Sequence, residues 1–296
     1  MIDTSTLLYS EFKIKQLQHS FVVNQLLSEY LGKRETGEKH PIYDFLFEYY
    51  FFSPSQLEKF SPGIAVSIIN DCENYEDFTL PNKNFYSFSD EKNAWIMQTQ
   101  SLSQKRKDSL TWVITLLEHT QQNEPQFACL GLHEWAMLYK NETNVRHSLA
   151  LRVSARELQH LVESKPLKCT HFDAFRFFTK EANPLNKTRL TKDSRVKSEQ
   201  SACVHANMDI YKWSHKFYPW ISSELILESF YLAIEARTID MQASPYDVSL
   251  IGLNPIRIET KEGAEEYVRY QKQLCIKGNS IRLKLIHELE QLKNCS

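Results

Sequence analysis

The sequence has little glycine and no excess of basic residues. Glycine supplies 7 of 296 residues, whereas its average share is about 7%. Folds that depend on glycine-rich turns, such as dinucleotide-binding sheets, are therefore disfavoured, and helices are favoured. Lys and Arg total 35 against 37 Asp and Glu, which gives a formal net charge of −2. No overall positive field indicates nucleic acid as the partner, although a local field remains open.

Several sequence signals are also missing. The chain has no GxGxxG, P-loop, HExxH or GxSxG motif, and it lacks the zinc-deaminase pattern. The most apolar stretch, "YDFLFEYYFF" (43–52), is short and contains Glu48, so we expect no membrane span. The first residues, "MIDTSTLLYSEF", do not resemble a signal peptide. Without one, the six cysteines are expected to be reduced thiols of a cytoplasmic protein.

The apolar residues that are present recur at helical spacing. In 7–31, for example, leucine, isoleucine and phenylalanine return every three or four residues. No repeat and no linker marks a domain boundary. The pattern predicts a mainly α fold, a single compact helical domain over 1–296 with few or no short strands. Surface loops are expected at 71–93 and 183–200, and the predicted helices cover 7–31, 101–121, 222–241, 262–275 and 279–293.

Three short segments carry the residues most suited to chemistry. Each contains a cysteine, then a histidine two or four residues later, then a carboxylate within four residues. A carboxylate beside an imidazole can fix its tautomer and raise its basicity, which suits acid–base catalysis. Three imidazoles with a carboxylate could instead bind a metal, and ordinary core packing is a third explanation. The pairs are His133 with Glu134, His171 with Asp173, and His205 with Asp209.

Other polar and aromatic side chains lie near these segments in the sequence. In 203–217 a helix would place His205, Asp209 and Lys212 on one face, either as part of a site or as an ordinary charged surface. The candidates for contact with a flat or charged substrate are Trp135, Arg176, Lys212, Trp213 and Tyr246.

The segment "NKTRLTKDSRVK" (186–197) is basic and resembles a loop. Such a loop could bind phosphate groups, although a solvated charged loop is the commoner explanation. The expected phosphate-binding residues are Lys187, Arg189, Lys192, Arg195 and Lys197.

Five stretches together resemble a bacterial family whose members commonly carry the label 3-methyladenine DNA glycosylase. They are "KHPIYDFLFEYY" (39–50), "CLGLHEWAMLY" (129–139), "CTHFDAFRFFT" (169–179), "CVHANMDIYKW" (203–213) and "DMQASPYD" (240–247).

The resemblance implies an enzyme that hydrolyses the N-glycosidic bond of alkylated purines in DNA without a cofactor. A carboxylate would stabilise the positive charge that develops on the sugar, and an aromatic pocket would select the base. Asp173 or Asp209 is the expected carboxylate, with His171 and His205 orienting water. The alternative is a metal-dependent enzyme acting on a small molecule, with or without a phosphate, whose ion is held by His133, His171 and His205.

Overall fold

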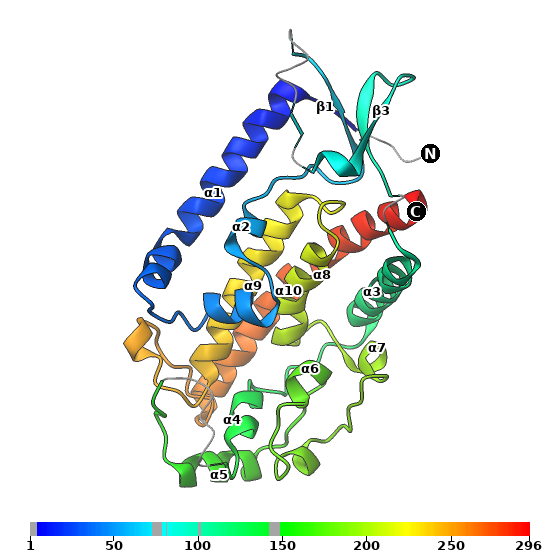
Figure 1. Cartoon of the computed structure of the whole chain (residues 1–296). Coiled ribbons are helices and arrows are strands. Elements are labelled where there is room, and N and C mark those ends of the chain that lie inside the picture. The colour runs from blue at the N-terminus through cyan, green and yellow to red at the C-terminus, as the bar shows by residue number, and fades with distance from the viewer. Residues whose placement is uncertain (1–4, 73–78, 81, 100–101, 142–148) are drawn as a thin grey trace. The chain divides into compact units, whose positions relative to one another are not determined.

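The computed structural model describes residues 5–72, 79–80, 82–99, 102–141 and 149–296 (Figure 1). The fold is mainly helical, as the sequence predicted, with one small mixed sheet. The chain forms two compact units, and each unit combines segments that are distant in sequence. The single domain predicted from the sequence stays a prediction. Unit 1 contains 1–114, 210–231 and 281–296, whereas unit 2 contains 115–209 and 232–280.

The sheet belongs to unit 1 and has the strand order β1-β2-β4-β3. β1 and β2 are parallel, while β2–β4 and β3–β4 are antiparallel. One strand lies inside the expected loop 71–93, because a hairpin strand of four residues needs little apolar sequence. The strands are β1 (Ser5–Leu8), β2 (Val66–Ile69), β3 (Tyr86–Ser89) and β4 (Ala94–Met97), and the 3-10 helix η3 (Lys83–Phe85) precedes β3.

The helices divide between the units. Those of unit 1 are α1 (Tyr9–Glu35), the π-helix η1 (Phe45–Tyr49) and α2 (Pro54–Leu57). Four helices contribute residues to both units: α3 (Gln104–Gln122), α8 (Val204–Lys216), α9 (Ser223–Ala243) and α10 (Lys261–Cys295). Among the described residues, none of the helices has the length and apolar character that crossing a membrane would require.

Unit 2 also contains several short helices, drawn in green and orange in Figure 1. α5 illustrates how they form: Ser154 caps its first turn together with Glu157, and Leu158, Leu161 and Val162 are its buried face. The expected loop 183–200 contains two of these helices. The short helices of unit 2 are α4 (His133–Leu138), α5 (Ala155–Ser164), α6 (Phe172–Phe175), η4 (Asn183–Leu185), α7 (Arg195–Ser198) and η5 (Ser249–Ile251).

The two helices predicted at 262–275 and 279–293 are one helix, α10, which continues through Gly278. A Cβ atom at Gly278 would lie 2.1 Å from Oδ1 of the buried Asn207. The Asn207 side chain is held in turn by the Ser201 carbonyl oxygen, which accepts its Nδ2 hydrogen at 3.0 Å. Glycine is therefore required here by close packing in unit 2.

We expect Gly278→Ala to lower the free energy of unfolding, although alanine favours helices. Steric overlap in a packed core costs about 1–3 kcal/mol, which exceeds the roughly 1 kcal/mol gained in helix propensity. The control is Gly32→Ala in α1, where no atom lies within 4 Å of the added carbon. Urea denaturation should show opposite signs for the two variants. A stabilised Gly278→Ala variant would contradict the close packing.

In unit 1, His215 on α8 is buried among aromatic rings. Its ring centroid lies 3.8 Å from that of Phe52, 5.9 Å from Tyr211 and 6.2 Å from Tyr218. Burial without a carboxylate partner lowers the pKa of His215 from 6.5 to about 4. Between pH 6.5 and about pH 4, the imidazole of His215 therefore binds a proton in the unfolded chain but not in the folded chain.

Native stability should consequently fall relative to His215→Phe as the pH decreases from 6.5 towards 4. The difference follows from the pKa shift and amounts to about 3 kcal/mol at most. Unfolding free energies of both proteins at pH 7 and pH 4.5 measure it. Equal pH dependence of the two proteins would show that His215 is protonated in the folded state.

Candidate functional site

The three cysteine–histidine segments all lie in unit 2, and each histidine is at the start of a helix. His133 is the first residue of α4, His171 is the N-cap of α6, and His205 is the second residue of α8. The structure brings the rings together. The centroid of His205 lies 4.2 Å from that of His133, edge to face, and 5.5 Å from that of His171, nearly stacked.

On one side of His205 is the Arg237 cluster, which we define as His133, Glu134, Arg237 and Asp240. Arg237 Nη1 donates to Glu134 Oε1 at 3.1 Å and to Asp240 Oδ2 at 2.5 Å. His133 Nδ1 lies 3.4 Å from Asp240 Oδ1, and its Nε2 lies 3.6 Å from Glu134 Oε1. The side chains of these residues are at most 9% exposed, so every charge in the cluster is removed from water.

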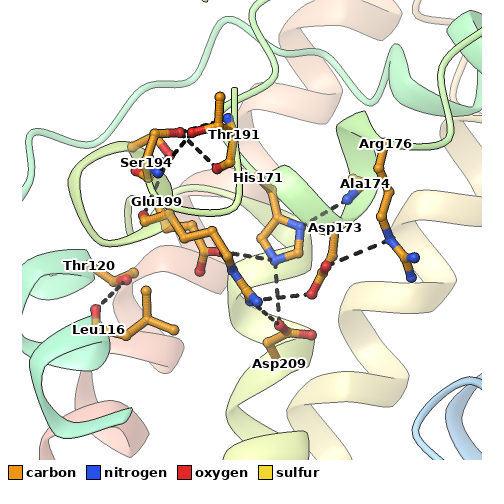
Figure 2. A network of polar contacts seen from close by, with 12 residues as sticks. Leu116, Thr120, His171, Asp173, Ala174, Arg176, Thr191, Ser194, Glu199 and Asp209 are labelled. Carbon is orange, nitrogen blue, oxygen red and sulfur yellow. Dashed lines mark hydrogen bonds and ion pairs between the residues drawn. The ribbon is translucent and has the colours of Figure 1, made fainter. Parts of the chain in front are cut away.

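On the other side is the Arg195 cluster, which consists of His171, Asp173, Arg195, Glu199 and Asp209. Arg195 Nε donates to Glu199 Oε1 at 3.1 Å, and Nη2 lies 3.2 Å from Asp173 Oδ2 and 3.8 Å from Asp209 Oδ2. Figure 2 shows His171 directed at Glu199 and Asp209, with distances of 3.8 and 3.5 Å from Nε2 to the nearest oxygens.

The tautomer of His171 is set by its place at the start of α6. Its Nδ1 accepts the backbone N–H of Ala174 at 3.2 Å (Figure 2). A ring nitrogen that accepts a hydrogen bond carries no proton, so the proton of the neutral ring is on Nε2, facing the carboxylates. In the neutral ring His171 thus presents an N–H to Glu199 and Asp209, and the metal-ligand role considered from the sequence stays a prediction.

The pKa values of the cluster histidines, His133 and His171, are raised, whereas the pKa of His205 between them is lowered. Burial by itself would lower the pKa of His133 and His171. The two carboxylates beside each ring, Asp240 with Glu134 and Glu199 with Asp209, together outweigh burial and raise both pKa values. Burial lowers the pKa of His205 far below its ordinary value, and the two neighbouring histidines lower it further. Burial also raises the pKa of Asp240, against the opposing effects of His133 and Arg237.

Three residues offer ligand atoms to a single ion. These atoms, one from each of His133, His205 and Asp240, all lie within 4.8 Å of one another. The 3.4 Å between His133 Nδ1 and Asp240 Oδ1 is near the roughly 3–3.5 Å that separates two ligands bound at about 2.1 Å to one metal. Glu134 would then orient His133 through the other ring nitrogen, as carboxylates beside metal-binding histidines do.

A small cavity reaches His133 and His205. The volume that the centre of a water molecule can occupy is about 20 Å³, which is room for about one water. Burial raises the pKa of its three thiols, so they are protonated and not nucleophilic. The cavity is lined by the cysteines of all three segments (Cys129, Cys169 and Cys203), and also by Leu132, Leu167, Phe178, Val204 and Tyr267.

The aromatic candidates are packed in the core. Trp135 is fully buried, and its Nε1 donates to the Ala243 carbonyl oxygen at 2.9 Å. Tyr246 is also buried in unit 2. In unit 1, Trp213 packs edge to face against Trp112, with the Lys212 ammonium 4.3 Å from its ring centroid. These placements show packing roles for the three rings, and their predicted contacts with a substrate stay predictions.

The cationic candidates divide into two groups. Arg195 is buried within its cluster, so its guanidinium holds carboxylates and does not face a phosphate. Arg176 is half exposed, with Nε 3.6 Å from Asp173 Oδ1. The remaining members of the basic segment are exposed: Lys187, Arg189, Lys192 and Lys197.

Sequence reasoning missed Arg237, Asp240 and Glu199. A signal for the first two was present, because Arg237 and Asp240 are three residues apart in an otherwise apolar helix, where charges need partners. Glu199 lies just before the third cysteine–histidine segment, but nothing local distinguishes it from a surface glutamate.

No protein-family model, curated protein or solved structure matches this chain. The family resemblance inferred from the five sequence stretches therefore stays a prediction.

Proposed function

We propose that the chain is a metal-dependent enzyme that acts on a small molecule. The observation that supports this most directly is the convergence of His133, His205 and Asp240, two imidazoles and one carboxylate, beside a cavity. Such a ligand set leaves coordination positions open for water or substrate, and it suits divalent iron, zinc or a related ion.

The charges of the two clusters also favour a cation. Glu134, Glu199, Asp209 and Asp240 are buried, and two buried guanidinium groups oppose them. Buried carboxylates are costly unless positive charge lies close to them, and a divalent ion would supply such charge in addition to the two guanidinium groups. Protonation of the neighbouring histidines is the competing way to balance them.

Within this proposal, each residue has a separate role. His133, His205 and Asp240 bind the ion, Glu134 orients His133, and Arg237 holds Glu134 and Asp240 in place. The ion would polarise a substrate oxygen or lower the pKa of a bound water. Since the cavity admits about one water, the reacting end of the substrate must be small.

The test is metal content measured on freshly purified protein, followed by titration of chelator-treated protein with Fe²⁺, Zn²⁺ and Mn²⁺. Binding of one equivalent with micromolar or tighter affinity supports the proposal. Protein that neither retains nor rebinds any of these ions would refute it, and protonated histidines would then balance the carboxylates.

A second candidate function is the N-glycosylase activity that the sequence resemblance implies, cytoplasmic and directed at alkylated DNA. It is supported by the exposed basic residues Lys187, Arg189, Lys192 and Lys197, and by Asp173, whose side chain is 16% exposed at the edge of the Arg195 cluster. In this case a carboxylate would act on the sugar without a metal.

Release of 3-methyladenine from methylated DNA in the presence of a chelator separates the two functions. If the second candidate is correct, Asp173→Asn should lower release by about 10²–10³-fold, because the charge that stabilises the transition state is lost. In the same case Arg189→Glu with Lys192→Glu should flatten the dependence of DNA affinity on salt, which has a slope of about −0.9 per phosphate contact. Lys293→Glu is the control, and no base release from any protein would exclude this function.

A further inference from the structure

A shallow basic groove shares the loop of residues 129–131 with the cavity beside His133 and His205. Its volume is about 640 Å³, and it is formed by α10 and the loop before α4. All of its lining residues belong to unit 2. Its cations are Lys165, Lys261, Arg269 and Lys272, and the one carboxylate among its lining residues is Glu265.

Some lysines elsewhere in the described part of the chain are neutralised by a neighbouring carboxylate. Lys15, Lys33, Lys277 and Lys284 each form an ion pair with a glutamate. In contrast, Lys261, Arg269 and Lys272 have no carboxylate within ion-pair distance among the described residues. Lys272 Nζ lies 5.8 Å from the ring centroid of Phe127, which leaves its charge uncompensated. A surface with several cations and few carboxylates attracts anions.

The floor of the groove is apolar. Leu130, Ala264 and Val268 line it between the charged side chains. A purely inorganic anion would gain nothing from these side chains, whereas an organic molecule with a phosphate could cover them. The groove therefore combines a site for charge with a site for an apolar or aromatic group.

The loop of residues 129–131 connects the groove to the proposed metal site. Leu130 lines the groove, while Cys129 and Gly131 line the cavity. The loop has an unusual backbone: Leu130 has φ 48° and Gly131 has φ 65°. A leucine in this region is strained, and a Cβ at Gly131 would lie 3.1 Å from the Tyr267 hydroxyl. The loop, packed against Tyr267 of α10, therefore contributes residues to both the groove and the cavity.

We propose that this groove binds the phosphate-bearing part of a small organic molecule. The phosphates contact Arg269 and Lys272, and the organic part covers Leu130, Ala264 and Val268. The role of the groove as a substrate site rests on the proposed function. Ligand binding in the groove does not, because it is measured without the metal.

The experiment is calorimetric titration of the full chain with ADP, with pyrophosphate and with a short DNA duplex. We expect ADP to bind more tightly than pyrophosphate, because only ADP can cover the apolar floor. Arg269→Glu with Lys272→Glu should weaken ADP binding by about tenfold or more, since contacts of phosphate with charged groups are lost. Both side chains are exposed, so the fold is retained. Lys180→Glu, which changes an exposed lysine elsewhere in unit 2, is the control.

Three results would overturn the inference. They are no binding of ADP at millimolar concentration, ADP binding that the double charge reversal leaves unchanged, or binding of the DNA duplex that the double charge reversal abolishes and the control variant retains. The last would assign the groove to nucleic acid. Metal content of the same preparations keeps the two proposals separate. Metal without ADP binding contradicts the groove alone, whereas ADP binding without metal contradicts the proposed metal-dependent function alone.

Discussion

Replacement of Arg237 by methionine is expected to lower the free energy of unfolding by about 3–5 kcal/mol, the usual cost of breaking a buried ion pair. Arg237 is 1% exposed, and its Nη1 bonds both Glu134 and Asp240. Methionine fills much of the same volume but leaves two carboxylates buried without their cation. The measurement is urea denaturation in the presence of a chelator, so that loss of a bound ion does not contribute.

Two controls identify the cause. Lys277→Met removes an exposed ion pair with Glu235 in the same unit, and it should change stability by less than about 1 kcal/mol. Combining Arg237→Met with Glu134→Gln and Asp240→Asn removes the buried charges together and should recover a large part of the loss. If Arg237→Met is no more destabilising than Lys277→Met, the buried carboxylates are not ionised in the folded chain.

The helical class of the fold followed from the sequence because apolar periodicity is a local property. In α1, for example, the described helix Tyr9–Glu35 agrees with the predicted 7–31 within a few residues. The four-residue strand β3 and the continuity of α10 through Gly278 did not follow. Both depend on a partner elsewhere in the chain: β4 pairs with β3, and the Asn207 side chain lies against Gly278.

The division into two units was also hidden from the sequence. A domain boundary is visible in a sequence when a polar or proline-rich linker separates two continuous segments. Here the units share α3, α8, α9 and α10. The boundary therefore falls inside continuous helices, where no linker marks it in the sequence.

At the candidate site, the sequence identified the residues that carry reactive groups, and the structure supplies their partners. The recurrence of cysteine and histidine in three segments placed His133, His171 and His205 in one hypothesis. Their arrangement depends on the tautomer of His171, which a backbone N–H from Ala174 determines, and on Asp240, which is more than 30 residues away in sequence from each histidine. Spacing along a sequence contains neither kind of information.

Replacement of His205 and, separately, of His171 distinguishes the ligand set of the structure from the three-histidine set considered from the sequence. His205 contacts its neighbours through its ring, and no hydrogen bond involves it among the residues that the structure describes. His205→Phe therefore keeps an aromatic ring between His133 and His171 while removing both ligand nitrogens. In His171→Asn, the amide oxygen can accept the Ala174 N–H as the imidazole does.

We expect His205→Phe to weaken metal binding by at least about 100-fold, the upper end of what loss of a residue behind a ligand costs. His171→Asn should change it by less than about tenfold, because His171 is not a ligand in this arrangement. Native protein at a free metal concentration 100 times its dissociation constant gains about 2.7 kcal/mol of stability, and His205→Phe should gain almost none. Thermal denaturation with and without metal measures this difference, with the exposed His160→Phe as the control. Equal losses in His205→Phe and His171→Asn would restore the three-histidine set, whereas undiminished metal binding in His205→Phe would place the ion elsewhere.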